Sequence, residues 1–105
     1  MAFGLSEHII NKLVNLFDKN DQVEEAILFG SRAKGNYREG SDIDIALKGN
    51  KLTLKTLKKI EVQIDQLFLP YEVNLVLYHY INNPVLSDHI ERVGISIYNT
   101  KVTKG

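Results

Sequence analysis

Residues 26–47 read AILFGSRAKGNYREGSDIDIAL and combine an apolar run, a glycine-serine turn and two closely spaced acids. The apolar run at 26–29 is typical of a buried strand, which Gly30 and Ser31 end. Alternation of acidic and apolar residues predicts a second strand over 42–47. A glycine-serine turn and a pair of carboxylates are therefore expected on two adjacent strands.

The turn at Gly30 and Ser31 is expected to lead into a short helical turn that runs through Ala33. Backbone N–H groups at the start of a helix lack intrahelical partners, and with the helix dipole they bind anions such as phosphate. Glycine lets a phosphate approach the backbone, and the Ser31 hydroxyl is a further donor. Gly-Ser is also common in ordinary turns, so alone it does not establish a phosphate site.

Asp42 and Asp44 lie two residues apart on the expected strand, so their side chains face the same way, about 6.5–7 Å apart along the chain. Ile43 and Ile45 then point into the core. Adjacent carboxylates repel one another, and a site that keeps them together usually supplies a cation. Oxygen ligands suit Mg²⁺, which also takes phosphate oxygens. The alternative is an edge strand with solvated acids, but the turn and the acids together predict a phosphoryl-transfer site.

Hydrophobic periodicity predicts alternating helices and strands around this stretch. Ser6 is a good N-cap for the first helix, and Pro70 is expected to enforce the end of the second long helix. The order predicts a small α/β fold in one domain over 1–105, with helices packed on a sheet. We expect helices over 6–19, 53–68 and 84–94, and strands over 23–29, 42–47, 73–77 and 95–98.

Composition narrows the classes of function. Thirteen Lys and Arg balance thirteen Asp and Glu, so strong nucleic-acid binding by a basic face is not expected. The absence of Cys excludes disulfides, zinc-thiolate sites and cysteine nucleophiles. No apolar run approaches the ~20 residues that span a bilayer, and the N-terminus lacks a signal-peptide pattern, so we expect a cytoplasmic protein. His8 and His89 have no spaced metal partner and are not assigned as ligands.

Two blocks of the sequence resemble the signature of the minimal nucleotidyltransferases of the DNA polymerase β superfamily, GS-R-A-x-G followed by S-D-x-D. The blocks are Gly30-Ser31-Arg32-Ala33-Lys34-Gly35 and Gly40-Ser41-Asp42-Ile43-Asp44-Ile45-Ala46. The resemblance is strongest over 26–47 and extends, by element order, over nearly the whole chain. It implies a palm-like mixed sheet, here of about four strands with flanking helices, that binds Mg²⁺ and a nucleoside triphosphate, most often ATP.

The resemblance also assigns roles by position. Asp42 and Asp44 would be catalytic and would hold metal ions. Arg32 would pair with phosphate or with an acid, or would be a surface cap. Ser41 is expected to form hydrogen bonds at the end of the loop rather than to act as a nucleophile. The nucleotide-binding residues would be Gly30, Ser31, Arg32 and Ser41.

One position departs from the family pattern. The family usually carries a third carboxylate in a V-D-L-V context on the next strand, and this chain has Val73-Asn74-Leu75-Val76 there. Asn74 can offer a carbonyl oxygen to a metal, but it carries no charge and cannot act as a base at neutral pH. Glu72 lies on the same face. It compensates only if its longer side chain swings over, and it is otherwise an exposed acid at the strand end.

Two functions remain open at this point. The first is a Mg²⁺-dependent nucleotidyltransferase that moves a nucleoside monophosphate, expected to be AMP, to an acceptor hydroxyl and releases pyrophosphate. The second is a weakened or inactive nucleotidyltransferase fold that works as a binding module. The resemblance implies that such small proteins are often antitoxins of HEPN-type toxins. Because the chain has little beyond the palm, we expect a HEPN-type protein partner, or a homodimer, to complete the site.

Overall fold

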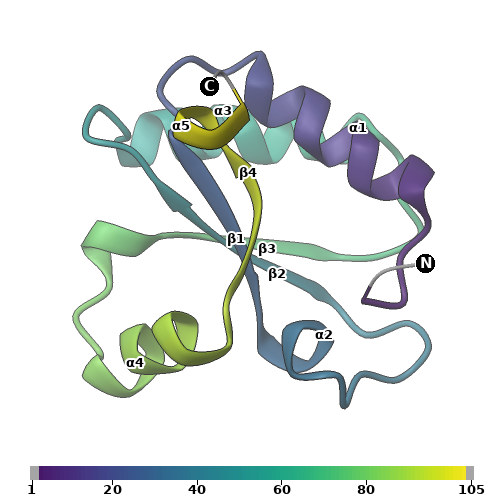
Figure 1. Cartoon of the computed structure of the whole chain (residues 1–105). Helices are drawn as coiled ribbons and strands as arrows, with labels where there is room; N and C mark the ends of the chain where they lie inside the picture. The colour runs from purple at the N-terminus through teal and green to yellow at the C-terminus, as the bar shows by residue number, and fades with distance from the viewer. Residues whose placement is uncertain (1–2, 104–105) are drawn as a thin grey trace.

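The computed structural model describes residues 3–103, in which helices and strands alternate as the sequence predicted (Figure 1). The helices are α1 (Glu7–Asp18), α2 (Gly30–Lys34), α3 (Leu54–Asp65), α4 (Pro84–Val93) and α5 (Thr100–Thr103), with a 3₁₀ helix η1 (Tyr78–Tyr80). The strands are β1 (Glu25–Phe29), β2 (Ile43–Lys48), β3 (Val73–Leu77) and β4 (Ile95–Asn99).

The four strands form one mixed sheet in the order β3-β2-β1-β4. β1 runs antiparallel to both of its neighbours, whereas β2 and β3 are parallel. A parallel pair needs a crossover connection, and α3 lies in that connection. The predicted mixed sheet of about four strands with flanking helices is therefore confirmed. Its register sets Phe29 opposite Asp44, and Asp44 opposite Asn74.

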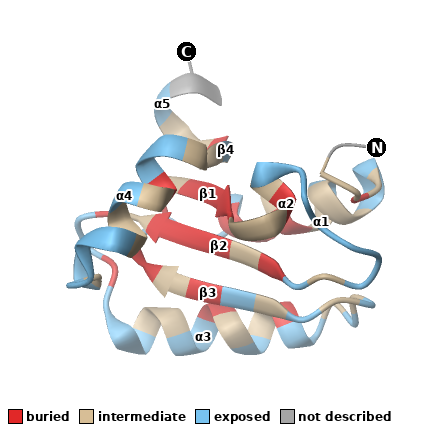
Figure 2. Cartoon of the chain, turned by 90° about the horizontal axis from the view of Figure 1, so that it is seen from below, coloured by how far each residue is buried: buried red, intermediate tan, exposed pale blue. Residues whose placement is uncertain are grey.

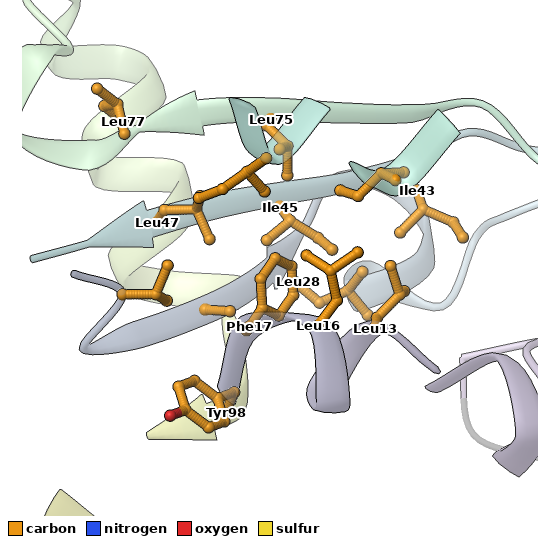
Figure 3. Packing of buried hydrophobic residues seen from close by; sticks show 14 of the residues in the cluster. Leu13, Leu16, Phe17, Leu28, Ile43, Ile45, Leu47, Leu75, Leu77 and Tyr98 are labelled. Atoms are coloured by element: carbon orange, nitrogen blue, oxygen red, sulfur yellow. The ribbon is translucent and has the colours of Figure 1, made fainter. Parts of the chain in front are cut away.

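One face of the sheet is covered by α1 and α3, which lie together above it in Figure 1. Ile43 and Ile45 point to this face and are fully buried, which is the orientation that the alternating pattern of β2 predicted. Figure 3 shows the apolar side chains of α1 meeting those of the sheet. The residues labelled there are Leu13, Leu16, Phe17, Leu28, Ile43, Ile45, Leu47, Leu75, Leu77 and Tyr98.

The opposite face carries α2 and α4, and Figure 2 views the molecule from that side. A smaller apolar cluster joins β1, β2 and α4 there, through Ile27, Phe29, Ala46 and Ile90. Asp44 alternates with Ile43 and Ile45 along β2, and Asn74 alternates with Val73 and Leu75 along β3, so both point to this face. The polar side chains of the motif thus lie on the face of the sheet that carries the smaller apolar cluster.

The ends of several elements differ from the predicted ones. The helix expected over 53–68 ends at Asp65, because Leu67 N donates to Ile64 O in a tighter turn and Phe68 adopts a left-handed φ of 52°. Pro70 therefore does not set this end. Neither η1 nor α5 was predicted.

Between residues 3 and 103, no helix is long and apolar enough to cross a membrane.

Candidate active site

The two aspartates of the motif lie at the start of β2. Asp44 is half-buried between Phe29 of β1 and Asn74 of β3, and Asp42 is exposed just before the strand. Ile43, between them, points the other way and is fully buried. This buried isoleucine fixes the orientation of the strand, so both carboxylates are presented on the α2 and α4 side.

Asn74 bridges the two carboxylates. Its Nδ2 donates to Asp44 Oδ1 at 3.0 Å and to Asp42 Oδ2 at 3.2 Å. An amide nitrogen has two N–H groups, which is enough for one donor to each acid. These donors offset part of the repulsion between the two negative charges. The three side chains that the sequence singled out on two strands therefore meet at one place.

Glu72 does not join this group through any contact of its side chain that the structure records. Its backbone oxygen accepts from Ile43 N at 2.9 Å, which continues the ladder between the two strands, and its side chain is exposed. Within residues 3–103, no three His, Cys, Asp or Glu side chains stand close enough together to hold a metal ion. Among the described residues, no third acidic side chain therefore joins the pair, and the side chain recorded in contact with both aspartates is Asn74.

Gly30 lies directly beside the acid pair. It has a φ of 76°, in the left-handed region that favours glycine. A Cβ at this position would lie 2.3 Å from Asp44 Oδ2, closer than two nonbonded atoms can approach. The glycine therefore lets β1 turn into α2 without a connecting loop while the backbone touches the carboxylate. Ser31, half-buried in the first turn of α2, accepts from Gly35 N and Asn36 N through its backbone oxygen.

Arg32 is turned into the protein and is only 3% exposed. Its Nη2 and Nε donate to Ser41 O at 2.7 and 3.1 Å, and its Nη1 donates to Phe3 O at 2.9 Å. The guanidinium also lies over the rings of Tyr71 and Tyr37, with distances of 4.7 and 5.4 Å to the ring centroids. The alternative role of Arg32 as a surface cap is wrong, since the side chain is buried. Arg32 ties the loop before β2 to the N-terminal segment.

Ser41 closes the loop that leads into the acid pair. Its backbone N donates to Arg38 O at 3.0 Å, and its Oγ accepts from Arg38 N at 2.8 Å. With the Arg32 contacts to its carbonyl, both the backbone and the side chain of Ser41 hold this turn. The role as a hydrogen bonder at the end of the loop agrees with these contacts.

His89 of α4 also reaches the site, although no sequence signal placed it there. Its Nε2 accepts from Gly30 N at 3.2 Å, and its ring meets Phe29 edge-on, with the centroids 6.2 Å apart. The partners are separated by 59 positions along the chain. A lone histidine on a helix gives no indication of such a contact, because the contact depends on how α4 packs against β1.

A charged cluster on the α4 side holds that helix against the end of β2. Tyr78 Oη donates to Glu91 Oε1 at 2.5 Å, and Lys48 Nζ lies 3.6 Å from the same oxygen. The Tyr78 hydrogen bond and then the Lys48 charge lower the pKa of Glu91, and the same hydrogen bond raises the pKa of Tyr78. Glu91 is exposed, and Tyr78 and Lys48 are partly exposed, so we expect this cluster to add little to the stability of the fold.

A family model described as "Polymerase beta, Nucleotidyltransferase" matches residues 11–103. The chain belongs to this nucleotidyltransferase family. The match spans the glycine-serine turn, the acid pair and all four strands. Asn74 therefore lies within the matched domain, on the strand next to the two aspartates.

Relatives of this nucleotidyltransferase domain include one curated protein and several solved structures. "Putative protein adenylyltransferase MJ0141" of Methanocaldococcus jannaschii is 30% identical over 80 residues, which are 73% of this chain and 81% of that protein. A structure of a tri-AMPylated Shewanella oneidensis HEPN toxin in complex with MNT antitoxin is 20% identical, with a TM-score of 0.69 over 95% of this chain and 77% of that one. A toxin-antitoxin structure with AMP-PNP is 24% identical, with a TM-score of 0.71 over 88% and 74%. At these identities, the two structures show a shared fold.

Proposed function

We propose that this domain transfers AMP from ATP to a hydroxyl group on a protein partner. The observation that carries the proposal is the meeting of Asp42, Asp44 and Asn74 beside the Gly30 turn. A phosphate-binding turn next to paired oxygen ligands is what phosphoryl transfer requires. The relative named as an adenylyltransferase supports AMP as the transferred group, and a protein as the acceptor.

The side chains beside Gly30 suit Mg²⁺. Asp42 and Asp44 supply hard anionic oxygens, and Mg²⁺ in proteins is often held by one or two carboxylates together with substrate phosphates. Asn74 can add its Oδ1 once its amide turns, because the group has one donor end and one acceptor end. The metal, when bound, would neutralise phosphate charge and polarise the reacting phosphorus. Asp42, Asp44 and Asn74 are the residues that would hold it.

The remaining motif residues would bind and order the substrate. Gly30 and Ser31 would receive triphosphate oxygens through their backbone N–H groups and the Ser31 hydroxyl. We assign Arg32 a positioning role, because its donors already hold Ser41 O and Phe3 O inside the protein. Ser41 would hold the loop that orients Asp42. Both residues would then affect nucleotide binding through the loop rather than by touching phosphate.

In the transfer step, the acceptor oxygen forms a bond to the α-phosphorus, and the bond from that phosphorus to the α–β bridging oxygen breaks. Pyrophosphate leaves with that oxygen. The hydroxyl proton cannot go to Asn74, because an amide does not accept a proton at neutral pH. We expect it to pass to Asp42, to Asp44 or to water, and the carboxylates lose basicity when they hold a cation. We therefore expect slow turnover.

The proposal is tested with ATP labelled on the α-phosphate or on the γ-phosphate, in Mg²⁺ or Mn²⁺, with a HEPN-type protein as acceptor. The α label should appear on the acceptor, and the γ label should leave in pyrophosphate. Asp44→Asn should abolish transfer, whereas Asp65→Asn, an exposed acid on α3, should leave it unchanged. Absence of α-label transfer with either metal would refute the activity.

A second candidate is a binding module that neutralises a HEPN-type toxin by forming a complex. It is favoured by the Asn74 amide, which donates to both aspartates from the position where the family usually carries a third carboxylate. The similar structure of a HEPN toxin in complex with MNT antitoxin supports the class of partner. The double variant Asp42→Ala, Asp44→Ala separates the two candidates. Full neutralisation by this variant would favour binding alone, and lost neutralisation with an intact complex would favour transfer.

A further inference from the structure

The first amide of α2 already has a partner in the folded protein. Gly30 N donates to His89 Nε2 at 3.2 Å, and Phe29, the residue before the helix, gives no side-chain cap. A backbone N–H at a helix start is one of the groups that the proposed triphosphate site uses. The imidazole nitrogen thus lies where an oxygen of a bound phosphate would receive the Gly30 hydrogen bond.

We propose that His89 is a nucleotide-positioning residue, which accepts from Gly30 in the free protein and donates to a triphosphate oxygen when nucleotide binds. The inference rests on the proposed function and adds a residue from α4 to its site. A phosphate oxygen is charged and is a stronger acceptor than a neutral imidazole nitrogen. It would therefore take over the Gly30 N–H, and Nε2 would then face that oxygen.

Histidine suits this exchange because either of its two ring nitrogens can be the hydrogen-bond donor while the other is the acceptor. In the free protein Nε2 accepts, which puts the proton of the neutral ring on Nδ1. Moving the proton to Nε2 changes that nitrogen from acceptor to donor and leaves the net charge of the ring unchanged. Neither a carboxylate nor an ammonium group can act as acceptor and donor in turn without a change of charge.

The packing of α4 allows the ring to stay near Gly30 throughout. Phe29 meets the imidazole edge-on at an interplanar angle of 80°. On the same helix, Glu91 bonds to Tyr78 and lies near Lys48, so α4 is held at both η1 and β2. His89 is half-buried, so its side chain keeps some exposure to solvent. The ring therefore lies beside Gly30 without being closed off inside the core.

The test measures the affinity of ATP and of adenosine for the full chain and three variants, in Mg²⁺. His89→Phe keeps a ring against Phe29 but removes the nitrogen, and we expect ATP binding to weaken about 10-fold, which is about 1.4 kcal/mol. His89→Gln can accept or donate through its amide, and we expect it to stay within about threefold of the parent protein. His8→Gln, on α1, is the matched control and should change nothing. Adenosine binding should be equal in all four proteins.

Nitrogen-15 NMR of the His89 ring gives a signature that a structural role alone would not. We expect the proton on Nδ1 in the free protein and on Nε2 with ATP bound. Unchanged ring shifts on ATP binding, or equal or tighter ATP binding by a folded His89→Phe, would overturn the role of His89. These outcomes leave the proposed function standing, whereas a parent protein that binds no ATP at all would refute the proposed function itself.

Discussion

Replacing Asn74 by Asp tests whether the Asn74 amide offsets the repulsion between the carboxylates of Asp42 and Asp44. Asn74 Nδ2 donates to both aspartates, at 3.0 and 3.2 Å. The substitution removes both donors and places a third negative charge about 3 Å from two others. Each such contact repels by about 1.4 kcal/mol in bulk water, so two give about 3 kcal/mol. Rotation of the exposed side chains lowers this figure, and we expect the free energy of unfolding to fall by about 1–2 kcal/mol without metal.

The same substitution should reverse its effect when Mg²⁺ is present. A third carboxylate strengthens a cation site, so we expect Mg²⁺ affinity to rise at least about tenfold. Bound metal then stabilises the folded state by mass action. The assay is urea unfolding of the parent protein, Asn74→Asp and Asn74→Ala, in EDTA and in excess Mg²⁺. Asn74→Ala controls for the lost hydrogen bonds, because it adds no charge.

Two results would refute this reasoning. One is an Asn74→Asp protein as stable as the parent in EDTA, which would mean that the amide does not hold the carboxylates together. The other is a destabilised Asn74→Asp protein that Mg²⁺ fails to rescue, which would mean that the three side chains do not form a cation site. If the lost acid limits catalysis, Asn74→Asp should also increase AMP transfer.

Gly30→Ala should lose about 2 kcal/mol of stability by thermal unfolding, because its Cβ would meet Asp44 at a strained backbone angle. ATP binding should also fall, and a stable variant would argue against this tight contact. Arg32→Lys should lose about 2 kcal/mol, since an ammonium cannot reproduce the buried fork of hydrogen bonds; an unfolding midpoint equal to the parent's would contradict this. Burial, and then its hydrogen bond to Asp18, raise the pKa of Tyr98 in the folded state. The contribution of Tyr98 to the free energy of unfolding should therefore be fully present below its unfolded pKa of about 10. It should be lost as the pH rises through the higher pKa of the folded state. Tyr98→Phe should flatten that decline in urea midpoints measured across the range, and an equally steep decline would point to other groups.

The pattern of β2 was predictable because its two sides have opposite chemistry. Alternation of Asp44 with Ile43 and Ile45 fixes which side faces the core, so the direction of the acid pair followed from the sequence. The order of helices and strands, and the departure at Asn74, were equally visible. The order of elements follows from local periodicity and spacing, and the departure at Asn74 follows from the resemblance to the family pattern; neither depends on how distant elements pack.

The features that were missed depend on contacts between distant segments. The burial of Arg32 was missed, because its partners Phe3 and Ser41 come from two other segments of the chain. His89 contacts Gly30 only because α4 packs against β1. The early end of α3 comes from the left-handed Phe68, an unusual backbone angle for an aromatic residue that no local rule predicts. The extent of the single domain predicted over 1–105 stays a prediction.

The central claim is that Asp42 and Asp44 form a cation site next to a triphosphate-binding turn. Its most direct test is a crystal of the full chain grown with Mn²⁺ and a nonhydrolysable ATP analogue, with anomalous scattering collected to locate the metal. We predict an anomalous peak bonded to carboxylate oxygens of both Asp42 and Asp44, with phosphate density at the N–H groups of Gly30 and Ser31. Nucleotide bound elsewhere on the protein, or saturating Mn²⁺ with no peak between the two aspartates, would contradict the account.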